Sequence, residues 1–243
     1  MEVSMKLLTK EQWLRKRRRR RFFRIIMLSS LFICGVAGIF LISISNKIKP
    51  QNIPFLPGPS GEKIMDTISE HLTINQMFLT PNDYSRPQTP LKKVNSIVIH
   101  YTANPGTTAE NNRNYFENLR IKKETSASAH YIIGLDGEIV QCIPLNEISF
   151  ASNDRNIDTI SIECCHPDET GKFNNETYDS LVSLVAWLCY EYGLEKEDII
   201  RHYDVTGKCC PRYFVEHEDA WKDFKNDVTI YIEEKIKENN GEM

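Results

Sequence analysis

The segment Ser96-Ile-Val-Ile-His-Tyr-Thr102 decides the fold, because its apolar run is typical of a buried strand. His100 stands at the end of this run, where a polar side chain leaves the apolar layer. A second segment, Thr159-Ile-Ser-Ile-Glu-Cys-Cys165, has the same character and carries Glu163. Two such strands, separated by stretches with helical periodicity, predict an α/β domain.

The segments around these strands complete the prediction of one domain over residues 94–237. Apolar residues recur every three or four positions in several stretches, and a Leu-Asp-Gly turn at 135–137 joins two strand-like runs. We therefore expect a central mixed β-sheet flanked by helices, followed by a short tail at 238–243. The expected elements are a helix at 108–119, a hairpin at 129–143, a helix at 178–192, a strand at 198–202 and a closing helix at 220–237.

The composition fits one sizeable core, but the charge is unevenly distributed. The 243 residues are 41% hydrophobic and 26% charged, with a net charge of −3, which is ordinary for a soluble enzyme. Seven consecutive basic residues at 15–21 stand against an acidic remainder. The net charge therefore says little about partners, and the basic run has a local cause in the segment that follows it.

Residues 22–45 are apolar except for Arg24 and predict one transmembrane helix. At about 1.5 Å per residue, a helix of this length crosses a hydrocarbon core of about 30 Å. The basic residues before it place residues 1–21 in the cytoplasm as a basic tail and the rest of the chain outside. We therefore expect a single-pass protein of the cell membrane with an extracytoplasmic domain.

Two alternatives to a membrane anchor stay open. A cleaved signal peptide has the same order of basic and apolar residues, although the apolar part is long for one and no good small-x-small cleavage site precedes Lys47. The second alternative is that the arginines bind nucleic acid. The adjoining apolar span argues against this role, so we expect no nucleic-acid partner. Residues 46–93 contain seven prolines and indicate a stalk and lead-in, with enough apolar spacing for a short helix at 63–78.

The seven cysteines do not form the even, regularly spaced set that is typical of a disulfide framework. Two adjacent pairs stand out, Cys164-Cys165 and Cys209-Cys210. Neighbouring residues on a strand point to opposite faces, so one member of each pair is expected to face a site and the other the core. A disulfide between the pairs is the alternative, and a disulfide at Cys210 would remove that thiol from any metal site.

The stretch Arg201-His-Tyr-Asp-Val-Thr-Gly-Lys-Cys-Cys-Pro211 supplies the second half of a candidate metal site. His202 and Cys210, taken with His100, offer two imidazoles and one thiolate. This ligand set suits Zn²⁺ and leaves a fourth position open for water. A lone histidine on an apolar strand is otherwise a core residue, so the remote pair is what makes His100 a candidate ligand.

From about residue 94 to residue 228, the chain resembles the zinc-dependent N-acetylmuramoyl-L-alanine amidases of type 2, whose fold is shared by peptidoglycan recognition proteins. The resemblance covers more than half of the chain, and its motifs are specific when they are taken together. The matching segments are Ile97-Val-Ile-His-Tyr-Thr102, Ser128-Ala-His-Tyr-Ile-Ile133, Asp136-Gly-Glu-Ile-Val140, Asn156, Thr159-Ile-Ser-Ile-Glu163, His202 and Lys208-Cys-Cys-Pro211.

The resemblance implies that His100, His202 and Cys210 bind Zn²⁺ as the cofactor. It favours Cys210 over Cys209, because the eight-residue separation from His202 and the proline that follows match the family pattern. It also implies a place for Lys208 near the scissile carbonyl, where we expect its ammonium group to stabilise the oxyanion. A solvated loop lysine is the alternative.

A general base at Glu163 is implied as well, since many bacterial and phage members carry a glutamate in this place. A carboxylate at the end of an apolar strand is costly unless it faces a site or a partner, which agrees with that role. Other members use a tyrosine just before the residue that matches His130, and Ala129 occupies that position here. A buried ion-pair partner is the alternative for Glu163.

Substrate contacts are expected at three further residues. His130 is expected near the cleft floor, as a substrate contact or as structure at a strand end. Asn153 and Asn156 belong to a polar loop near the same end of the sheet, where they would bind polar groups of a muropeptide; a turn rich in Asn and Asp is the alternative.

Together, the resemblance and the apolar N-terminal segment predict a membrane-anchored enzyme whose partner is peptidoglycan. The resemblance implies hydrolysis of the amide between N-acetylmuramic acid and the L-alanine of the stem peptide by zinc-activated water. The alternative is a non-catalytic peptidoglycan-binding module on the same fold. Such a module would be expected to lack a metal ligand, whereas all three candidate ligands are present in the sequence.

Overall fold

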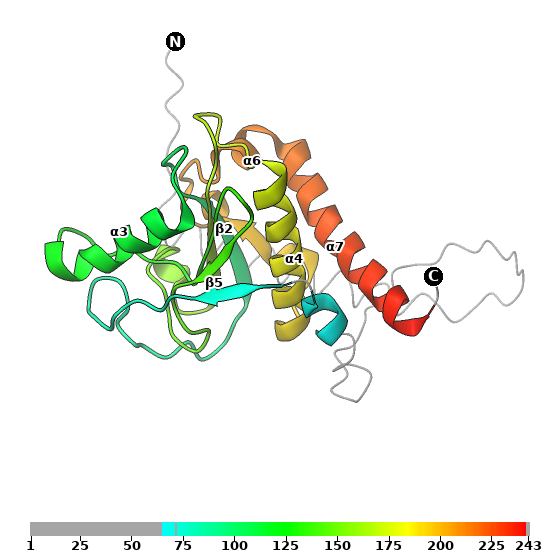
Figure 1. Cartoon of the computed structure of the whole chain (residues 1–243), viewed down its shortest axis with the longest axis horizontal. Helices are drawn as coiled ribbons and strands as arrows, with labels where there is room; N and C mark the ends of the chain where they lie inside the picture. Colours follow the sequence, from blue (N-terminus) through cyan, green and yellow to red (C-terminus); the bar gives the residue numbers. More distant parts are fainter. Residues whose placement is uncertain (1–64, 71, 242–243) are drawn as a thin grey trace, which may run out of the picture. The chain divides into compact units, whose positions relative to one another are not determined.

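The computed structural model describes residues 65–70 and 72–241 (Figure 1). The predicted cytoplasmic tail, the predicted membrane helix and the first part of the predicted stalk lie outside the described residues. Among the helices of the described part, none is both long enough and apolar enough to cross a membrane.

A six-stranded mixed sheet in the order β1-β4-β3-β5-β2-β6 forms the centre of the domain and confirms the predicted α/β class. β3 and β4 pair in an antiparallel arrangement, which is the predicted hairpin, and every other neighbouring pair is parallel. The two strands expected from their apolar runs, β2 and β5, are neighbours within this sheet. The strands are β1 (Ile74–Gln76), β2 (Ser96–Tyr101), β3 (Tyr131–Ile133), β4 (Ile139–Gln141), β5 (Thr159–Cys164) and β6 (Ile199–Arg201).

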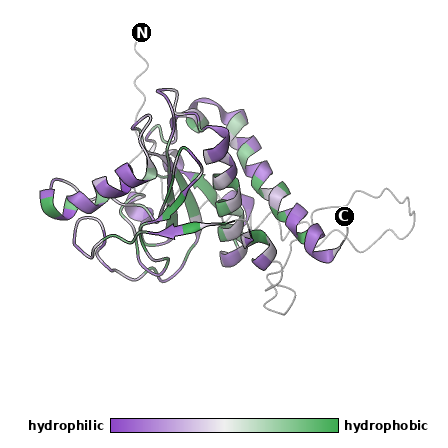
Figure 2. Cartoon of the chain, in the orientation of Figure 1, coloured by the Kyte–Doolittle hydropathy of each residue, from purple (hydrophilic) through white to green (hydrophobic). Residues whose placement is uncertain are grey.

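Helices cover both faces of the sheet, so the central strands are buried on both sides. Ile99 of β2 packs in the core formed with α4 (Asn175–Tyr192) and α7 (Glu218–Asn240). Ile132 of β3 packs on the opposite face with residues of α3 (Ala109–Lys122). Figure 2 shows the hydrophobic strands between helices that carry much hydrophilic surface. Burial on both faces explains why β2 and β5 are nearly continuous apolar runs.

The main helices begin and end at residues with suitable capping chemistry. Thr108 caps α3 and Asn174 caps α4, each by accepting a hydrogen bond from a backbone N–H group of the first turn. Gly193 ends α4 in the left-handed conformation. The helices predicted at 108–119 and 178–192 are thus confirmed. Four short helical segments were not predicted: η1 (Asn153–Arg155), η2 (Lys196–Asp198), α5 (His202–Thr206) and α6 (Arg212–Glu216).

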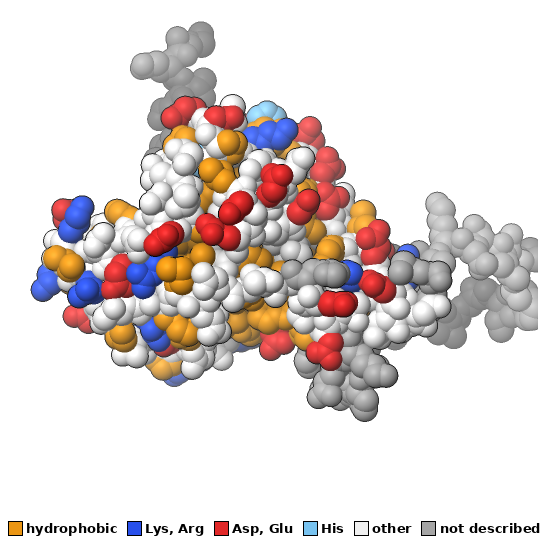
Figure 3. Space-filling view, viewed as in Figure 1, with side chains coloured by type: hydrophobic (Ala, Val, Ile, Leu, Met, Phe, Trp, Pro, Cys, Tyr) orange, Lys and Arg blue, Asp and Glu red, His pale blue; other side chains and the backbone are white. Residues whose placement is uncertain are grey.

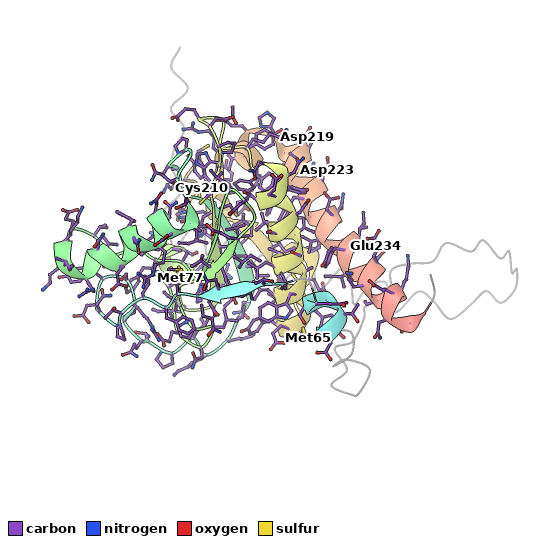
Figure 4. All side chains as sticks on the ribbon, in the orientation of Figure 1. Met65, Met77, Cys210, Asp219, Asp223 and Glu234 are labelled. Carbon is purple, nitrogen blue, oxygen red and sulfur yellow. The ribbon has the colours of Figure 1, made fainter. Side chains whose placement is uncertain are left out.

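Helix α7, expected as the closing helix, is amphipathic. It buries Phe224 and Val228 in the core shared with α4. Figure 3 shows Asp and Glu side chains along its outer side, and Figure 4 marks Asp219, Asp223 and Glu234 on this helix. The apolar stripe alone faces the protein, which accounts for the helical periodicity in the sequence.

The domain begins earlier than the sequence suggested. The sequence predicted a stalk and lead-in as far as residue 93, whereas the described residues between 65 and 93 are part of the fold. Strand β1 adds to the edge of the sheet beside β4. The short helix expected over 63–78 is limited, in the described part, to residues 65–69.

Packing explains why this proline-rich segment is ordered. Ile68 is fully buried and Leu79 is nearly so. Arg86 forms an ion pair with Glu147 at 2.8 Å, which ties the segment to the loop after β4. Proline prevents a long helix but permits an extended chain, and this chain hydrogen-bonds along the sheet edge, for example from the Leu79 N–H to the carbonyl of Cys142.

The two members of each adjacent cysteine pair lie in different environments, but the expected division between a site and the core is not found, because only Cys210 of the four lies in the candidate metal group. Cys164 packs in the core on the α4 side and Cys165 in the core on the α3 side. Cys210 is buried, whereas Cys209 is exposed. All cysteines within the described ranges are free thiols, so the structure holds no disulfide between the two pairs.

Candidate metal centre

The carboxyl ends of three parallel strands bring the candidate ligands together. His100 of β2 and Glu163 of β5 are direct partners in the parallel register. β6 pairs with the other side of β2, and His202 follows it directly as the first residue of α5. The carbonyl of Cys210 accepts a hydrogen bond from the N–H of Tyr203, which brings this thiol back to the same end (Figure 4).

The three predicted ligands form one compact group. Their ligand atoms lie within 4.8 Å of one another, and all three side chains are buried. Sγ of Cys210 lies 3.8 Å from Nδ1 of His100, and the ring centroids of His100 and His202 are 4.7 Å apart. Tetrahedral zinc with bonds of about 2.0–2.3 Å separates its ligand atoms by about 3.3–3.6 Å, so small side-chain rotations complete such a site.

Burial sets the protonation of these ligands. It lowers the pKa of His100 well below the usual range, with the charges of His202 and Lys208 as further causes, and it also lowers the pKa of His202. Both imidazoles are therefore neutral at pH 7 and offer a lone pair. Burial raises the pKa of Cys210 to about 12, so a cation must stabilise its thiolate. Two neutral imidazoles and a buried thiol fit a zinc ion.

Glu163 faces the same space without belonging to the ligand set. Its side chain is 19% exposed, and Oε1 lies 4.0 Å from Nδ1 of His100. Oε2 is buried and has no hydrogen-bond partner among the described residues. Burial raises the pKa of Glu163 to about 8, opposed by the charge of Lys208. Burial disfavours the charged forms of both Glu163 and His100, which argues against the buried ion pair that was the alternative for Glu163.

The raised pKa of Glu163 predicts how the metal-free protein responds to pH. The folded chain holds the carboxyl proton more tightly than the unfolded chain, because the pKa rises from 4.5 to about 8 on folding. The resulting stabilisation is fully present below pH 4.5 and is lost as the pH rises through about 8. We expect the urea midpoint of the chelator-treated protein to fall over this range more steeply than that of Glu163→Gln. Parallel curves for the two proteins would contradict the prediction.

The ligand group opens into a pocket of about 160 Å³. Phe116 of α3 and Phe150 supply apolar walls, while Lys208 lines the pocket from an exposed loop. A larger hollow of about 550 Å³ is lined by Cys209 and Arg212, among others, but none of the three clustered ligands lines it. The smaller pocket is therefore the candidate reaction site. Its lining residues are His100, Tyr101, Phe116, Ala127, Ser128, Phe150, Ala151, Glu163, His202, Lys208 and Cys210.

His130 lies inside the sheet and does not line the pocket. Its Nε2 is 2.9 Å from the carbonyl oxygen of Glu147, which can only accept, so Nε2 donates. Nδ1 then accepts from the backbone N–H of Ser161 at 3.1 Å. Burial lowers the pKa of His130 to about 4, which keeps the ring neutral. This geometry fits structure at a strand end, the second of the two roles expected for His130.

The polar loop after Phe150 has a backbone role. Asn153 adopts the left-handed conformation, with φ of 51°, which asparagine tolerates better than most residues. Oδ1 of Asn156 accepts hydrogen bonds from the N–H groups of Ala151 and Ser152. Neither asparagine lines the pocket, although Ala151 does. The geometry therefore fits the alternative expected for this loop, a turn built with asparagine side chains.

Comparisons with known proteins place the residues of this site within a known family. The family described as N-acetylmuramoyl-L-alanine amidase matches residues 90–213, which include all three ligands and Glu163. The amidase CwlL of Bacillus licheniformis is 36% identical over 171 residues, covering 65% of this chain and 47% of CwlL. The amidase BlyA of Bacillus subtilis (strain 168) is 34% identical over 172 residues, covering 62% of this chain and 45% of BlyA. The chain thus spans about half the length of these curated relatives.

Solved structures show the same fold. PlyL is 26% identical with a TM-score of 0.56, and the match covers 65% of this chain and 97% of the PlyL chain. The catalytic domain of XlyA is 28% identical with a TM-score of 0.54, and the match covers 65% of this chain and 99% of that domain. Each match covers nearly the whole of the solved chain, so the described domain corresponds to a complete folded unit in these proteins.

Proposed function

The chain belongs to the N-acetylmuramoyl-L-alanine amidase family, and on this premise we propose that it hydrolyses the amide between N-acetylmuramic acid and the first L-alanine of the peptidoglycan stem peptide. The observation that carries the proposal is the meeting of His100, His202 and Cys210 with Glu163 at one pocket. The ligand set and the carboxylate are both needed for amide hydrolysis by activated water. The alternative function, peptidoglycan binding without catalysis, requires neither the three metal ligands nor the Glu163 carboxylate.

His100, His202 and Cys210 are the residues that would hold Zn²⁺. When bound, zinc supplies a Lewis acid that polarises a carbonyl group and lowers the pKa of water toward about 7. The chain contributes two neutral imidazoles and a single negative charge, which leaves one unit of the ion's positive charge uncompensated. Phe116 and Phe150 form apolar walls of the same pocket.

Glu163 is proposed to take the proton from the attacking water and then to deliver it to the leaving amine. Its pKa of about 8 describes the site without a cation. A positive charge within a few ångströms favours the ionised form, so a loaded site lowers this pKa and makes the carboxylate available as a base at neutral pH. Oε2 is free for this task, because no group in the described part of the chain donates to it.

Lys208 is proposed to stabilise the negative charge that develops on the carbonyl oxygen. It lines the pocket, and its positive charge acts on Glu163, His100 and His202. The side chain is exposed and has no ion-pair partner in the described part of the chain. An unpaired ammonium group on a pocket wall is placed to act on bound substrate.

Replacing Lys208 with methionine tests this role. We expect kcat to fall by about 10²-fold with little change in KM, because oxyanion donors act mainly in the transition state. Lys172→Met, which removes an exposed lysine from the larger hollow, is the matched control and should retain wild-type kcat. A Lys208→Met enzyme with unchanged kcat would reduce Lys208 to a solvated loop residue.

The N-terminal segment supports a proposal about location. The apolar stretch at 22–45 after the basic run at 15–21 is proposed to anchor the chain in the cell membrane, with the domain outside. In cells expressing the full chain, externally added protease should degrade the domain, and the protein should sediment with membranes after a salt wash. Release by salt would argue against a spanning anchor.

Mass spectrometry of digested peptidoglycan is the direct test of the reaction. The full chain, loaded with zinc and incubated with purified sacculi, should release free stem peptides and leave intact glycan strands. A chelator should stop the release and added zinc should restore it. Binding to sacculi without released peptides would favour the non-catalytic module.

A further inference from the structure

The buried hydroxyl group of Ser152 contacts Nε2, the second ring nitrogen of His100. Nδ1 of His100 faces Sγ of Cys210 at 3.8 Å, and Nε2 lies 3.4 Å from Oγ of Ser152. Ser152 is fully buried, and within the described ranges its hydroxyl is the only hydrogen-bonding partner of this Nε2. The sequence did not single out Ser152.

The position of the proton on the His100 ring decides which group donates in the contact between His100 and Ser152. A neutral imidazole carries one proton, so a ring that binds a metal through Nδ1 must carry its proton on Nε2. Nε2–H of His100 then donates to Oγ of Ser152. Histidine ligands usually donate their second N–H to such a partner, which fixes the tautomer and the ring orientation. His202, in contrast, has no side-chain hydrogen bond in the described part of the chain.

Ser152 is itself held in place by one carboxamide oxygen. Oδ1 of Asn156 accepts from the N–H of Ser152 at 2.6 Å and from the N–H of Ala151 at 3.0 Å. The carbonyl of Ser152 accepts from the N–H of Arg155 at 2.9 Å, which closes the same turn. Asn156 therefore fixes the backbone from which the Ser152 hydroxyl extends toward His100.

We propose that Ser152 and Asn156 are positioning residues for the metal site, with Asn156 ordering the turn and Ser152 holding His100 so that Nδ1 is directed to the metal. The inference rests on the proposed zinc chemistry. It assigns Asn156 a task at the metal instead of the substrate contact expected from the sequence. Ala151, in the same turn, lies in the pocket wall, so one short segment would both line the pocket and orient a ligand.

Zinc affinity of the full chain, measured by competition with a chromophoric chelator, tests the proposal. Ser152→Ala removes the acceptor, and we expect about 10–100-fold weaker zinc binding. Ser149→Ala is the matched control, because Ser149 is equally buried in the same segment but bonds to Ser161 and not to a ligand. Its zinc affinity should stay within about twofold of the wild type, a margin far smaller than the expected loss.

A pair of variants at Asn156 separates positioning from folding. Asn156→Asp keeps an acceptor oxygen for the two N–H groups, whereas Asn156→Leu keeps the shape and removes the acceptor. The Leu variant should bind zinc more weakly, and its Co²⁺ derivative should show altered visible bands, while the Asp variant should resemble the wild type in both. This pair also decides the matter if Ser152→Ala does not fold.

The outcomes distinguish this inference from the proposed function. If the wild-type chain binds no zinc, the proposed function itself fails. A second outcome is that the Ser152→Ala and Asn156→Leu variants bind zinc as tightly as the wild-type chain does. The positioning role is then wrong, while the proposed function stands. Equal weakening by Ser149→Ala would also overturn the positioning role, because the loss would then follow from packing alone.

Discussion

A Glu163→Gln chain is expected to bind zinc normally and to lose about 10²–10⁴-fold in the rate of peptide release from muropeptides. Glutamine has nearly the shape of glutamate but accepts no proton at neutral pH. Glu163 lies 4.0 Å from His100 and outside the three-residue ligand group, so its replacement leaves the ligand atoms untouched. The expected result is thus a loaded but inactive enzyme.

The controls for this variant are chosen to isolate proton transfer. Glu191→Gln removes an exposed carboxylate at the end of α4 and should leave the rate unchanged. Metal analysis should find the same zinc content in all three proteins. Undiminished turnover by Glu163→Gln would remove Glu163 from the mechanism, and loss of zinc together with activity would reassign it to the metal.

The sequence was sufficient to predict every strand of the central sheet except β1, and the residues of the ligand group. β2 and β5 are apolar runs long enough to be recognised alone, and a polar side chain at the end of each run marks the edge of the sheet. His202 and Cys210 are far from His100 in the chain, yet parallel pairing of β6 with β2 brings them together. Local pattern and family resemblance both point to these positions.

The residues that hold the site in place were not predictable in the same way. Ser152 acts through one hydroxyl on a turn, and its contact with His100 depends on the path of the backbone after Phe150. Asn156 was predicted to contact substrate because it is polar. Its structural role depends instead on the backbone N–H groups that donate to its side-chain oxygen. Likewise, the two partners of His130 come from a strand and a loop that the sequence does not place side by side.

The folded segment before residue 94 was obscured for a different reason. Its prolines are typical of a linker, and β1 has only three residues, which is too short for an alternating pattern to be recognised. Its order comes from an edge position beside β4 and from buried side chains such as Ile68 and Leu79. Experiments on the domain should therefore retain residues from 65 onward.

Replacing Cys210 with serine should abolish zinc binding and activity together. The Cys210 thiol is 2% exposed, and burial raises its pKa to about 12, so a metal cation is what makes the thiolate favourable there. Serine has a similar size but offers a neutral hydroxyl, which is a poor ligand for zinc compared with a thiolate. Two histidines alone leave the ion without its anionic ligand.

Cys209→Ser is the matched control, since it makes the same chemical change one residue away. The Cys209 side chain is exposed and lines the larger hollow instead of the ligand group. This variant should bind one zinc ion per chain and release stem peptides at the wild-type rate, whereas Cys210→Ser should do neither, even with zinc in excess. The reverse pattern would show that the family's spacing assigns the wrong cysteine. Zinc in both variants would mean that neither thiol is a required ligand, and the amide would then have to be cleaved by a different set of groups.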